Sequence, residues 1–515
     1  MPHPIRPGPP LVLYDAAATR AVEQSAAARL PAHALMQRAG LATARLALAL
    51  APHARRLWIA CGPGNNGGDG LEAAVHLRRW GLEPVVTWLG APDRAPADAR
   101  ASWRRAAEAG VHFADQPPEA LGPQDLCIDA LLGIGASRAP TGRMADWLAR
   151  LRSGPAPLLC VDLPSGLDAD TGVWHLLDAP ETIASGEAPT SDGGQKHLES
   201  PPAAVHTLSL LALKPGLFTG QGRDAGGQLW FDDLGIGDPG VPPTAWLTGA
   251  PAPAACPHAS HKGRFGDVAI VGGEGLAARG MGMAGAALLA ASAALHGGAG
   301  RVLVCPLDGG ALALDPGQPE LMFRTWPALA PALAALTVVC GCGGGEAVRA
   351  VLPEVLRRAP RLVLDADALN AIAATPDWQP LLAARHAAGQ ASVLTPHPLE
   401  AARLLGTTTG TVQTDRLRAA RALAERFQAT VVLKGSGSVV AAPSQAPRIN
   451  PTGGARLSTA GTGDVLAGLV GAALAAGAPA FDAACSAVYR HGAAADAWPD
   501  GRALTAGALA RALRS

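Results

Sequence analysis

Residues 56–70, RLWIACGPGNNGGDG, join a short apolar run to a glycine-rich segment. Such a run is typical of a buried strand, and the glycine and asparagine residues after it favour a tight loop. The same order recurs in LCIDALLGIG at 126–135 and in PLLCVDLPSGLDADTG at 157–172. Because stretches with helical spacing separate these runs, the sequence predicts a parallel sheet with helical crossovers. Ligands of such sheets bind at the carboxyl ends of the strands, where all three loops fall.

A second series of strand-and-loop units follows in the other half of the chain. GDVAIVGG at 266–273 predicts its first strand, and an alanine-rich helix is expected from about residue 282 to 296. The runs RVLVC, LTVVCG, RLVLDADALN, ASVLTPHP and TVVLKGSG continue the alternation. A chain of 515 residues is too long for one ordinary core, so we expect two α/β domains.

Composition sets the limits of these domains and narrows the class of function. We place the domains at 1–240 and 258–515, with a proline- and alanine-rich linker at 241–257 and a polar, flexible insert at about 174–205. The 42 basic and 42 acidic residues balance, which argues against general binding to nucleic acid or to anionic membranes. No run is apolar and long enough for a comfortable membrane span, and the eight cysteines lack paired spacing. These features predict a cytoplasmic protein with reduced cysteines in its core.

The segment LSTAGTGDVL at 457–466 predicts a site for an anion. Gly461 and Gly463 permit backbone angles that are closed to other residues, and they leave the amides from Thr462 to Val465 bare. A helix that begins at Asp464 would direct these amides and its positive dipole end at a phosphate. The Asp464 carboxylate either caps this helix or takes a proton from a substrate beside the anion.

Polar residues also end the predicted strands of the first half. Asp129 and Asp162 each follow an apolar run, where a carboxylate is costly unless it is paired or bound to a cation. Each carboxylate is either a cap for the next element or part of a shared site. Asn66, Asp129 and Ser165 together offer hard oxygen ligands for a cation, which leaves Asp162 as an acid or base. Asn65, Asn66 and Asp69 give the GNNGGDG loop more polar groups than a simple turn requires.

The second half contains three further polar strand ends. Asp365 and Asp367 are spaced so that both can face one cleft, and Asn370 extends this polar set. His397 lies between two prolines that stiffen its loop, although a lone histidine is more often structural. KGSGS at 434–438 combines a cation with glycine-exposed amides, which suits phosphate oxygens, although it is also compatible with a charged hairpin tip.

Taken together, these motifs resemble one known family. GNNGGDG, DALLGIG and VDLPSGLDADTG resemble NAD(P)H-hydrate epimerases, and HKGRFGDVAIVGG, LDADALN, LTPHPLEAARLLG, VVLKGSGSVV and AGTGDVLAG resemble ADP- or ATP-dependent NAD(P)H-hydrate dehydratases. The whole chain resembles the bifunctional bacterial repair enzymes. The resemblance implies a Rossmann-like three-layer N-terminal domain and a ribokinase-like α/β C-terminal domain. It also implies epimerisation of R- and S-NADHX and NADPHX, followed by nucleotide-dependent dehydration of the S form.

The resemblance implies a role for each matching residue. The catalytic residues would be Asp162 and Asp464. The hydrated cofactor would contact Asn65, Asn66, Gly67, Gly68, Asp69, Gly133, Ile134, Gly135, Ala136, Ser137, Arg138 and Ala139 in the first domain, and Ala286, Gly345 and His397 in the second. The nucleotide would contact Lys434, Gly435, Ser436, Gly437, Ser438 and Gly463. A K⁺ ion would bind Asn66, Asp129 and Ser165, ADP or ATP with Mg²⁺ would bind the second domain, and a homo-oligomer is expected.

Two departures and two alternatives accompany this resemblance. The chain has CGCGGG at 340–345 where the family has a G-P-G-x-G loop, and the insert at 174–205 is longer than expected. One alternative is a ribokinase-like small-molecule kinase with an N-terminal cofactor-binding module. The other is a first domain that binds a cofactor or a partner without catalysis.

Overall fold

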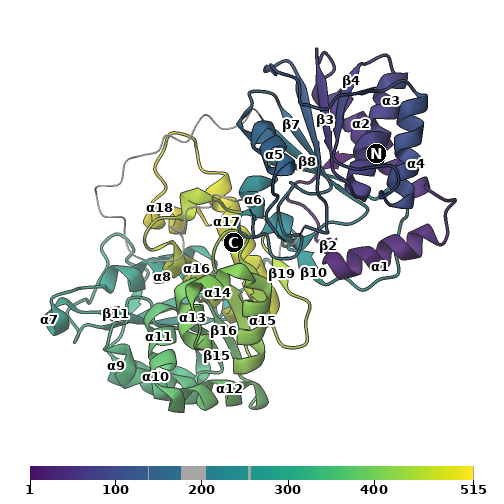
Figure 1. Cartoon of the computed structure of the whole chain (residues 1–515). Helices are drawn as coiled ribbons and strands as arrows, with labels where there is room; N and C mark the ends of the chain where they lie inside the picture. Colours follow the sequence, from purple (N-terminus) through teal and green to yellow (C-terminus); the bar gives the residue numbers. More distant parts are fainter. Residues whose placement is uncertain (137, 176–203, 253–256, 514–515) are drawn as a thin grey trace. The chain divides into compact units, whose positions relative to one another are not determined.

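The structure is a computed structural model that describes residues 1–136, 138–175, 204–252 and 257–513 (Figure 1). It contains two compact units, each described below by itself. The first unit comprises Met1–Arg6 and Val12–Ala245, and the second comprises Pro7–Leu11 and Trp246–Ser515. Most of the predicted insert, part of the predicted linker and Ser137 lie outside the described residues.

The sheet of the first unit is parallel except at one edge. Its order is β1 (His3–Pro4), β9 (Gln228–Asp232), β8 (Val205–Leu210), β7 (Leu158–Val161), β6 (Leu126–Ala130), β3 (Leu57–Cys61), β4 (Pro84–Trp88) and β5 (His112–Phe113). Only β1 pairs antiparallel, with β9. From β5 to β8 this is the strand order of a Rossmann fold, which confirms the fold predicted for this half.

Helices cover both faces of this sheet and make three layers. They are α1 (Ala16–Ala27), α2 (Ala34–Leu50), α3 (Asn65–Arg79), α4 (Ala97–Glu108), α5 (Arg143–Ser153) and α6 (Gly222–Ala225). One core packs α2 and α3 against residues such as Ile59 and Ile128, and the other packs α5 against Trp58 and Cys127. Neighbouring strand residues therefore point to opposite cores, as expected for a sheet that is buried on both faces.

The second unit is built around a longer mixed sheet. The order is β13 (Met322–Phe323), β12 (Arg301–Leu307), β11 (Asp267–Glu274), β14 (Thr337–Cys340), β15 (Arg361–Leu364), β16 (Ala391–Leu394), β17 (Thr430–Leu433), β18 (Val439–Ala441) and β19 (Arg448–Ile449), followed by β10 (Ala245–Leu247) and β2 (Leu11–Leu13). The strands from β13 to β17 are parallel, and β18 pairs antiparallel with β17 and β19. Every strand predicted from the sequence of this half is present.

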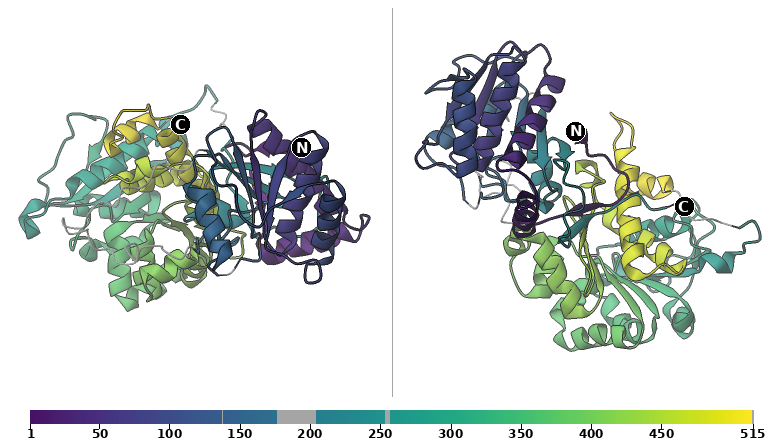
Figure 2. Two further views of the ribbon diagram at one scale, coloured as in Figure 1. Left: turned by 45° about the horizontal axis from the view of Figure 1, so that its top comes forward. Right: turned by 90° about the vertical axis from the view of Figure 1, so that its right-hand side faces the viewer.

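Helices also lie on both faces of the second sheet (Figures 1 and 2). One face carries α8 (Ala284–His296), α16 (Thr462–Ala475), α17 (Ala480–Asp496) and α18 (Ala506–Ala512), which share a core with Val268, Val339 and Val363. The remaining helices are α7 (Leu276–Arg279), α9 (Trp326–Leu329), α10 (Val348–Arg358), α11 (Ala366–Ala374), α12 (Gln379–Ala387), α13 (Pro398–Leu405), α14 (Thr409–Thr414) and α15 (Arg416–Phe427). The alanine-rich helix predicted from about residue 282 is α8.

Each sheet has one point where the strand order reverses. In the first unit the chain moves outward from β3 to β5 and then returns to β6 beside β3. In the second it moves from β11 to β13 and returns to β14 beside β11. Ligands of open α/β sheets bind outside the carboxyl ends of the strands at such points. GNNGGDG follows β3 and CGCGGG follows β14, so each unit has a glycine-rich segment at its reversal point.

Two further sequence expectations concern the cysteines and the membrane. The seven cysteines in the described ranges are buried and unpaired by disulfides. Within those ranges, every helix is too short or too polar to cross a bilayer.

Candidate active sites

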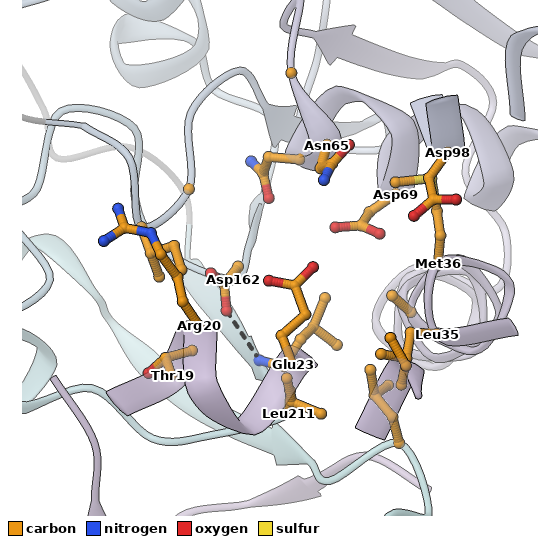
Figure 3. Close-up of a pocket in the computed structure, with 18 of the residues that line it drawn as sticks. Thr19, Arg20, Glu23, Leu35, Met36, Asn65, Asp69, Asp98, Asp162 and Leu211 are labelled. Carbon is orange, nitrogen blue, oxygen red and sulfur yellow. Dashed lines mark hydrogen bonds between the residues drawn. The ribbon is translucent and has the colours of Figure 1, made fainter. Parts of the chain in front are cut away.

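A cavity of about 830 Å³ lies in the first unit where β3, β6 and β7 end (Figure 3). Its walls come from these strand ends, from α1 and from the segment after β8. Asn65, Asn66, Asp69 and Asp162 line it, as the sequence predicts. The strand order therefore brings the GNNGGDG segment after β3 and the VDLPSG segment after β7 to one cavity.

The GNNGGDG segment is a helix rather than the predicted loop. Asn65 is the first residue of α3, and none of the segment's glycines has a positive φ. They are needed for space, because a Cβ at Gly67 would lie 2.0 Å from the Gly62 carbonyl oxygen, and one at Gly68 would lie 2.6 Å from Met36 Sδ. The prediction was wrong here because close packing and turn formation favour the same residue.

The predicted contact segment after β6 only partly faces the cavity. Gly133, Ile134 and Gly135 line it. Ala136, Arg138 and Ala139 are not among the lining residues, and Ser137 lies outside the described residues. A substrate contact from the second half of this segment remains a prediction.

Asp162 forms a buried ion pair that the sequence analysis did not predict. Its Oδ1 accepts hydrogen bonds from Lys214 Nζ and from the amide of Leu210 at 3.2 Å. The side chains of Lys214 and Asp162 are 1% and 14% exposed. Asp162 follows β7 with a positive φ of 66°, which residues other than glycine rarely adopt, and its side chain points toward the cavity. In the sequence, Lys214 stands out only because it is the single charged residue, apart from His206, in the otherwise mostly apolar run at 206–218.

Other carboxyl groups besides that of Asp162 also line the cavity, among them those of Asp69 and Asp98. Burial raises the pKa of Asp69 well above its ordinary value, and the nearby charges of Asp162 and Glu23 raise it further. Asp98 in α4 is bonded to His33 at the start of α2. A carboxyl group with a raised pKa keeps its proton to higher pH, and in the protonated form it can donate a hydrogen bond to a substrate oxygen.

The three residues predicted to bind a cation fit that role. Ser165 Oγ donates to Asp129 Oδ1 at 2.6 Å, and Ser165 N donates to Asp129 Oδ2 at 3.0 Å. Burial raises the pKa of Asp129, although the hydrogen bonds from Ser165 oppose that rise. In the described part of the chain, both polar atoms of the Asn66 side chain are buried without a hydrogen-bond partner. Buried polar atoms are seldom left unpaired, so Asn66 is suited to a ligand such as a cation.

In the second unit, Asp464 lies in the first turn of α16 but is not its cap. The helix begins at Thr462, two residues earlier than predicted, and its N-cap is Gly461 with φ 88°. Val465 N donates to Gly461 O at 3.1 Å, so the amides that precede the first helical bond are those from Thr462 to Asp464. The helix start therefore offers three amides rather than the predicted four, next to one carboxylate.

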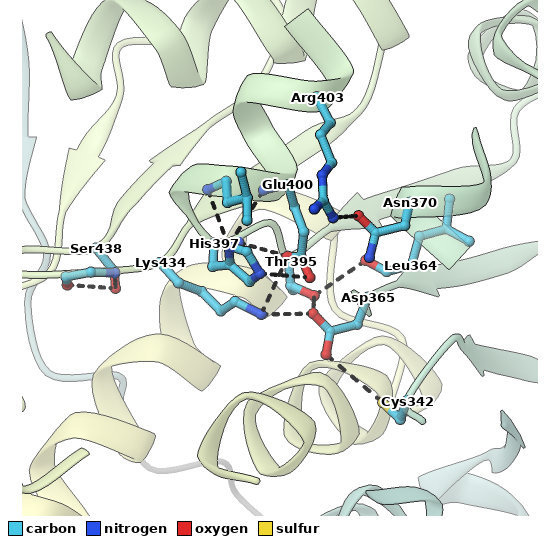
Figure 4. Close-up of polar contacts among 12 residues, drawn as sticks. Cys342, Leu364, Asp365, Asn370, Thr395, His397, Glu400, Arg403, Lys434 and Ser438 are labelled. Atoms are coloured by element: carbon cyan, nitrogen blue, oxygen red, sulfur yellow. Dashed lines mark hydrogen bonds and ion pairs between the residues drawn. The ribbon is translucent and has the colours of Figure 1, made fainter. Parts of the chain in front are cut away.

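Lys434 links the two predicted phosphate segments. A Cβ at Gly463 would lie 3.3 Å from Lys434 Nζ, which shows that the GTGD turn meets the KGSGS loop. Gly463 therefore provides space, since its φ is not positive. Lys434 Nζ also donates to Asp365 Oδ1 at 2.8 Å, and Thr395 Oγ1 donates to the same oxygen at 2.8 Å (Figure 4).

Asp464 has the electrostatic environment of a base. Burial raises its pKa to about 7, and the charge of Asp365 contributes to the rise, while Lys434 and a hydrogen bond with Cys342 oppose it. Ligand atoms of Cys342, Asp365 and Asp464 all lie within 4.8 Å of one another. A carboxyl group with a pKa near the working pH can both accept and release a proton.

A buried arginine, Arg416, binds the backbone at the start of the KGSGS loop. Arg416 NH2 donates to the carbonyl oxygens of Leu433 at 3.2 Å and Lys434 at 3.1 Å. A Cβ at Gly435 would lie 2.8 Å from this guanidinium group. At the loop tip, Gly435 N donates to Ser438 Oγ at 3.3 Å. Arg416 was missed in the sequence analysis because it is one arginine among several in an ordinary helix.

His397 caps α13. Its Nδ1 accepts hydrogen bonds from the amides of Leu399 at 3.1 Å and Glu400 at 3.3 Å, and its Nε2 lies 3.2 Å from Glu400 Oε1. The Glu400 side chain accepts from His397 N at 2.8 Å, which completes a capping box. The side chain of His397 is still 45% exposed, so the predicted substrate contact stays open beside this structural role.

The CGCGGG segment forms a tight turn without the proline of the family pattern. Gly341, Gly343 and Gly345 have φ values of 117°, 58° and 52°, which favour glycine. A Cβ at Gly343 would lie 2.9 Å from Ala286 Cβ, so α8 packs directly on the turn. Two predicted contact residues therefore lie where α8 meets this turn, Ala286 on the helix and Gly345 in the turn.

The two aspartates of LDADALN serve different partners. Asp365 faces Lys434, whereas Asp367 Oδ2 accepts from Gly345 N at 2.8 Å. Asn370 Oδ1 accepts from Arg403 at 2.7 Å. The prediction that both aspartates face one cleft is therefore unsupported, and Asp367 instead fixes the glycine-rich turn.

Comparisons with known proteins match both halves of the chain. A family model described as YjeF-related protein N-terminus matches residues 32–216, and one described as NAD(P)H-hydrate dehydratase matches residues 270–514. The bifunctional NAD(P)H-hydrate repair enzyme of Escherichia coli is 36% identical over 91% of this chain and 85% of its own length. The chain belongs to the bifunctional NAD(P)H-hydrate repair enzyme family. The NAD(P)H-hydrate dehydratase model covers most of the second unit, which is therefore the dehydratase domain of that family.

Further relatives of this repair enzyme family match one or both units. The enzyme of Coxiella burnetii is 31% identical over 94% of each chain. The ADP-dependent (S)-NAD(P)H-hydrate dehydratase of Neisseria meningitidis is 44% identical over 49% of this chain and 83% of its own length. A solved structure of the ADP/ATP-dependent dehydratase of Bacillus subtilis with ATP/Mg²⁺ is 29% identical, covers 50% of this chain and 91% of its own, and has a TM-score of 0.40. Full-length matches to repair enzymes favour this function over a small-molecule kinase.

Proposed function

We propose that this chain repairs hydrated NADH and NADPH at two separate sites, as an epimerase in the first unit and a nucleotide-dependent dehydratase in the second. The observation that carries this proposal is the pair of carboxylates, Asp162 and Asp464, each of which has a lysine beside it, Lys214 in the first unit and Lys434 in the second. Two such sites in one chain match a substrate that exists as two epimers.

In the first site, Asp162 would move protons at the hydroxyl-bearing C6 of the reduced nicotinamide ring. Lys214 fixes the direction of the carboxylate and balances its charge. Asn65 and Asp69 line the same cavity and can bind the polar carboxamide and hydroxyl groups of the hydrate. The cavity volume of about 830 Å³ is in the range of sites that enclose small molecules, and it is large enough for the nicotinamide half of the substrate.

K⁺ is the cation that we assign to Asn66, Asp129 and Ser165. The fit rests on the unpaired Asn66 side chain and on the buried Asp129 carboxylate. When bound, the ion would supply a positive charge that holds the three segments together. The proton movements at C6 belong to Asp162 and do not pass through the ion.

In the second site, Asp464 would take the proton from the C6 hydroxyl while the nucleotide supplies a phosphoryl group to that oxygen. The amides from Thr462 to Asp464 and the ammonium of Lys434 lie beside Asp464 and would stabilise the negative charge of the transferred group. Loss of the phosphorylated oxygen with a proton from C5 then restores the double bond of NADH. ADP is the donor that we propose. The Asp464 carboxylate would help to hold Mg²⁺, which would supply positive charge to the nucleotide phosphates.

One assay tests this function against its alternatives. The purified chain is incubated with mixed R and S hydrates, with and without ADP, and both epimers are followed by chromatography. Repair predicts that both epimers disappear and NADH forms only when ADP is present. Consumption of S alone would show an inactive first unit, whereas consumption of neither epimer would contradict the proposal.

A further inference from the structure

Helix α1 places a second carboxylate in the cavity of the first unit. Glu23 lines the cavity, and Figure 3 shows its carboxylate pointing inward toward Asp162 and Asp69. The helix precedes residue 32, where the match to the family model begins. Glu23 has no part in the proton movements described above, yet it is one of few acidic groups that reach the same space as Asp162.

The backbone ties α1 to the two segments that carry the ion pair. Tyr14 N donates to the carbonyl oxygen of Leu213, the residue before Lys214, at 2.9 Å. Ala16 N donates to Asp170 Oδ1 at 2.6 Å, in the loop that follows β7. These bonds attach the start of α1 to the segment after β8 and to the loop after β7. Residues of α1 therefore form one wall of the cavity.

Packing then determines the direction in which Glu23 points. Val22 is fully buried against Ala212, in a cluster that also contacts Leu211. Asp15 caps the helix, since its Oδ1 accepts from Ala18 N at 2.8 Å. With Val22 directed into the core, the next side chain along the helix must point elsewhere, and it points into the cavity.

Charge distinguishes Glu23 from Asp162. Partial removal from water in the cavity raises the pKa of Glu23, although the residue is still exposed to solvent, and the negative charges of Asp162 and Asp98 raise it further against the opposing effect of Lys214 and Arg20. Asp162, in contrast, accepts a hydrogen bond directly from the Lys214 ammonium. Two carboxyl groups in one cavity with such different surroundings are suited to opposite roles in proton transfer.

We propose that Glu23 is the second acid–base group of the epimerase site and acts on the face of the nicotinamide ring opposite Asp162. This inference rests on the proposed epimerase function. Inversion at C6 requires oxygen to leave one face and to return on the other, so one group must protonate the leaving hydroxyl and another must accept a proton from water. Asp162 comes from the end of β7 and Glu23 from α1, which are different walls of the cavity.

The step is balanced without an external reagent. The C6–O bond breaks as the lone pair of N1 forms an N1=C6 double bond, and the leaving oxygen takes the proton of Glu23 and departs as water. A second water adds to the other face of C6, the electron pair returns to N1, and Asp162 takes the proton of that water. In the reverse inversion Asp162 donates the proton to the leaving oxygen and Glu23 accepts the proton from water. Both carboxyl groups are therefore required in both directions.

The test compares the parent chain with Glu23→Gln, Glu23→Asp and a control, Glu108→Gln. Glu108 is the exposed last residue of α4 and does not line the cavity. Each protein receives the R hydrate in water enriched in ¹⁸O, without ADP, and the S hydrate and its label are followed by chromatography and mass spectrometry. We expect Glu23→Gln to lower kcat about 100-fold with KM changed less than about threefold, and Glu23→Asp to recover part of the rate.

The outcomes separate this inference from the function on which it rests. One ¹⁸O atom per inversion in the parent and in Glu108→Gln, with a slow Glu23→Gln, supports it. Parental kcat in Glu23→Gln, or inversion by the parent without label, overturns it and leaves the epimerase function standing. No inversion by the parent overturns both. An unfolding temperature of Glu23→Gln equal to that of the parent shows that the first unit is folded, so a slow rate is not a loss of structure.

Discussion

Lys214 donates a hydrogen bond from Nζ to Oδ1 of Asp162, and both side chains are withdrawn from solvent. The two residues lie on separate segments, one after β7 and the other after β8, and the adjacent strands bring them together. A buried ion pair contributes little net stability, but breaking it leaves one charge unpaired.

Replacement of Lys214 should therefore affect both stability and epimerisation. Lys214→Met removes the partner of Asp162, and we expect it to destabilise the first unit by about 3 kcal/mol and to abolish inversion of the hydrates. Lys214→Met combined with Asp162→Asn should be more stable than Lys214→Met alone, because no buried carboxylate remains. Thermal unfolding of the parent, Lys214→Met, Asp162→Asn and the double variant measures this coupling, and strictly additive losses would contradict it.

Dehydration should depend on the ionisation of Asp464. Its pKa is about 7, and only the ionised carboxylate can take a proton from the hydroxyl. The rate at saturating nucleotide should thus be constant well above pH 7 and fall about tenfold for each pH unit below it. A rate that rises toward acid pH would exclude Asp464 as the base.

The same raised pKa of Asp464 predicts that the stability of the second unit falls as the pH rises, whereas the dehydration rate increases. Because the folded-state pKa of about 7 lies above the ordinary value of 3.8, the native state binds the proton more tightly than the unfolded state, and the cost of the Asp464 carboxylate to folding builds up between these two pH values and is constant above about pH 7. Asp464→Asn should therefore raise the unfolding temperature of the second unit at pH 8 and change it little at pH 4. Calorimetry at the two pH values measures the difference.

Arg416 should affect nucleotide binding more than chemistry. Arg416→Met keeps much of the packing but loses the bonds to the carbonyls of Leu433 and Lys434. We expect the KM for ADP to rise about tenfold with kcat changed less than about twofold, and Arg416→Lys to restore part of the affinity. Arg421→Met, on the exposed side of the same helix, is the control. Equal effects of the two methionine variants would point to general destabilisation of α15.

The cation site should respond to a variant that breaks no hydrogen bond. In the described residues the Asn66 side chain has no hydrogen-bond partner, so Asn66→Ala should not destabilise the first unit in choline chloride. In KCl the parent should gain unfolding temperature and Asn66→Ala should gain much less, because the ligand is missing. An equal gain in both proteins would remove Asn66 from the proposed site.

The strands and their polar ends were predictable from the sequence because apolar runs and glycine-rich segments are local signals. Asp129, Asp162 and Lys434 all lie at or just after strands where the pattern predicted them. The boundaries of helices were less predictable. GNNGGDG was expected to be a loop because glycine serves turns and close packing alike, and only the structure shows that Gly67 lies against the Gly62 carbonyl.

Residues that act across long sequence distances were not predictable. Lys214 meets Asp162 from 52 positions away, and Arg416 reaches the carbonyl of Lys434 from 18 positions away. Their neighbours in the sequence give no hint of these partners, because the pairing depends on strand order and helix packing. Glu23 is a similar case, since its helix looks like any amphipathic surface helix until the cavity is seen.

The most direct test of the central claim, that one chain carries two independent carboxylate sites, is complementation between two variants. Asp162→Asn and Asp464→Asn are assayed separately and mixed, with racemic hydrate and excess ADP, while NADH absorbance and both epimers are followed for long enough to distinguish enzymatic from spontaneous inversion. The account predicts that Asp162→Asn converts S and leaves R, that Asp464→Asn inverts both epimers without forming NADH, and that the mixture converts everything. Complete conversion by either variant alone, or failure of the mixture when both proteins are folded, would contradict it.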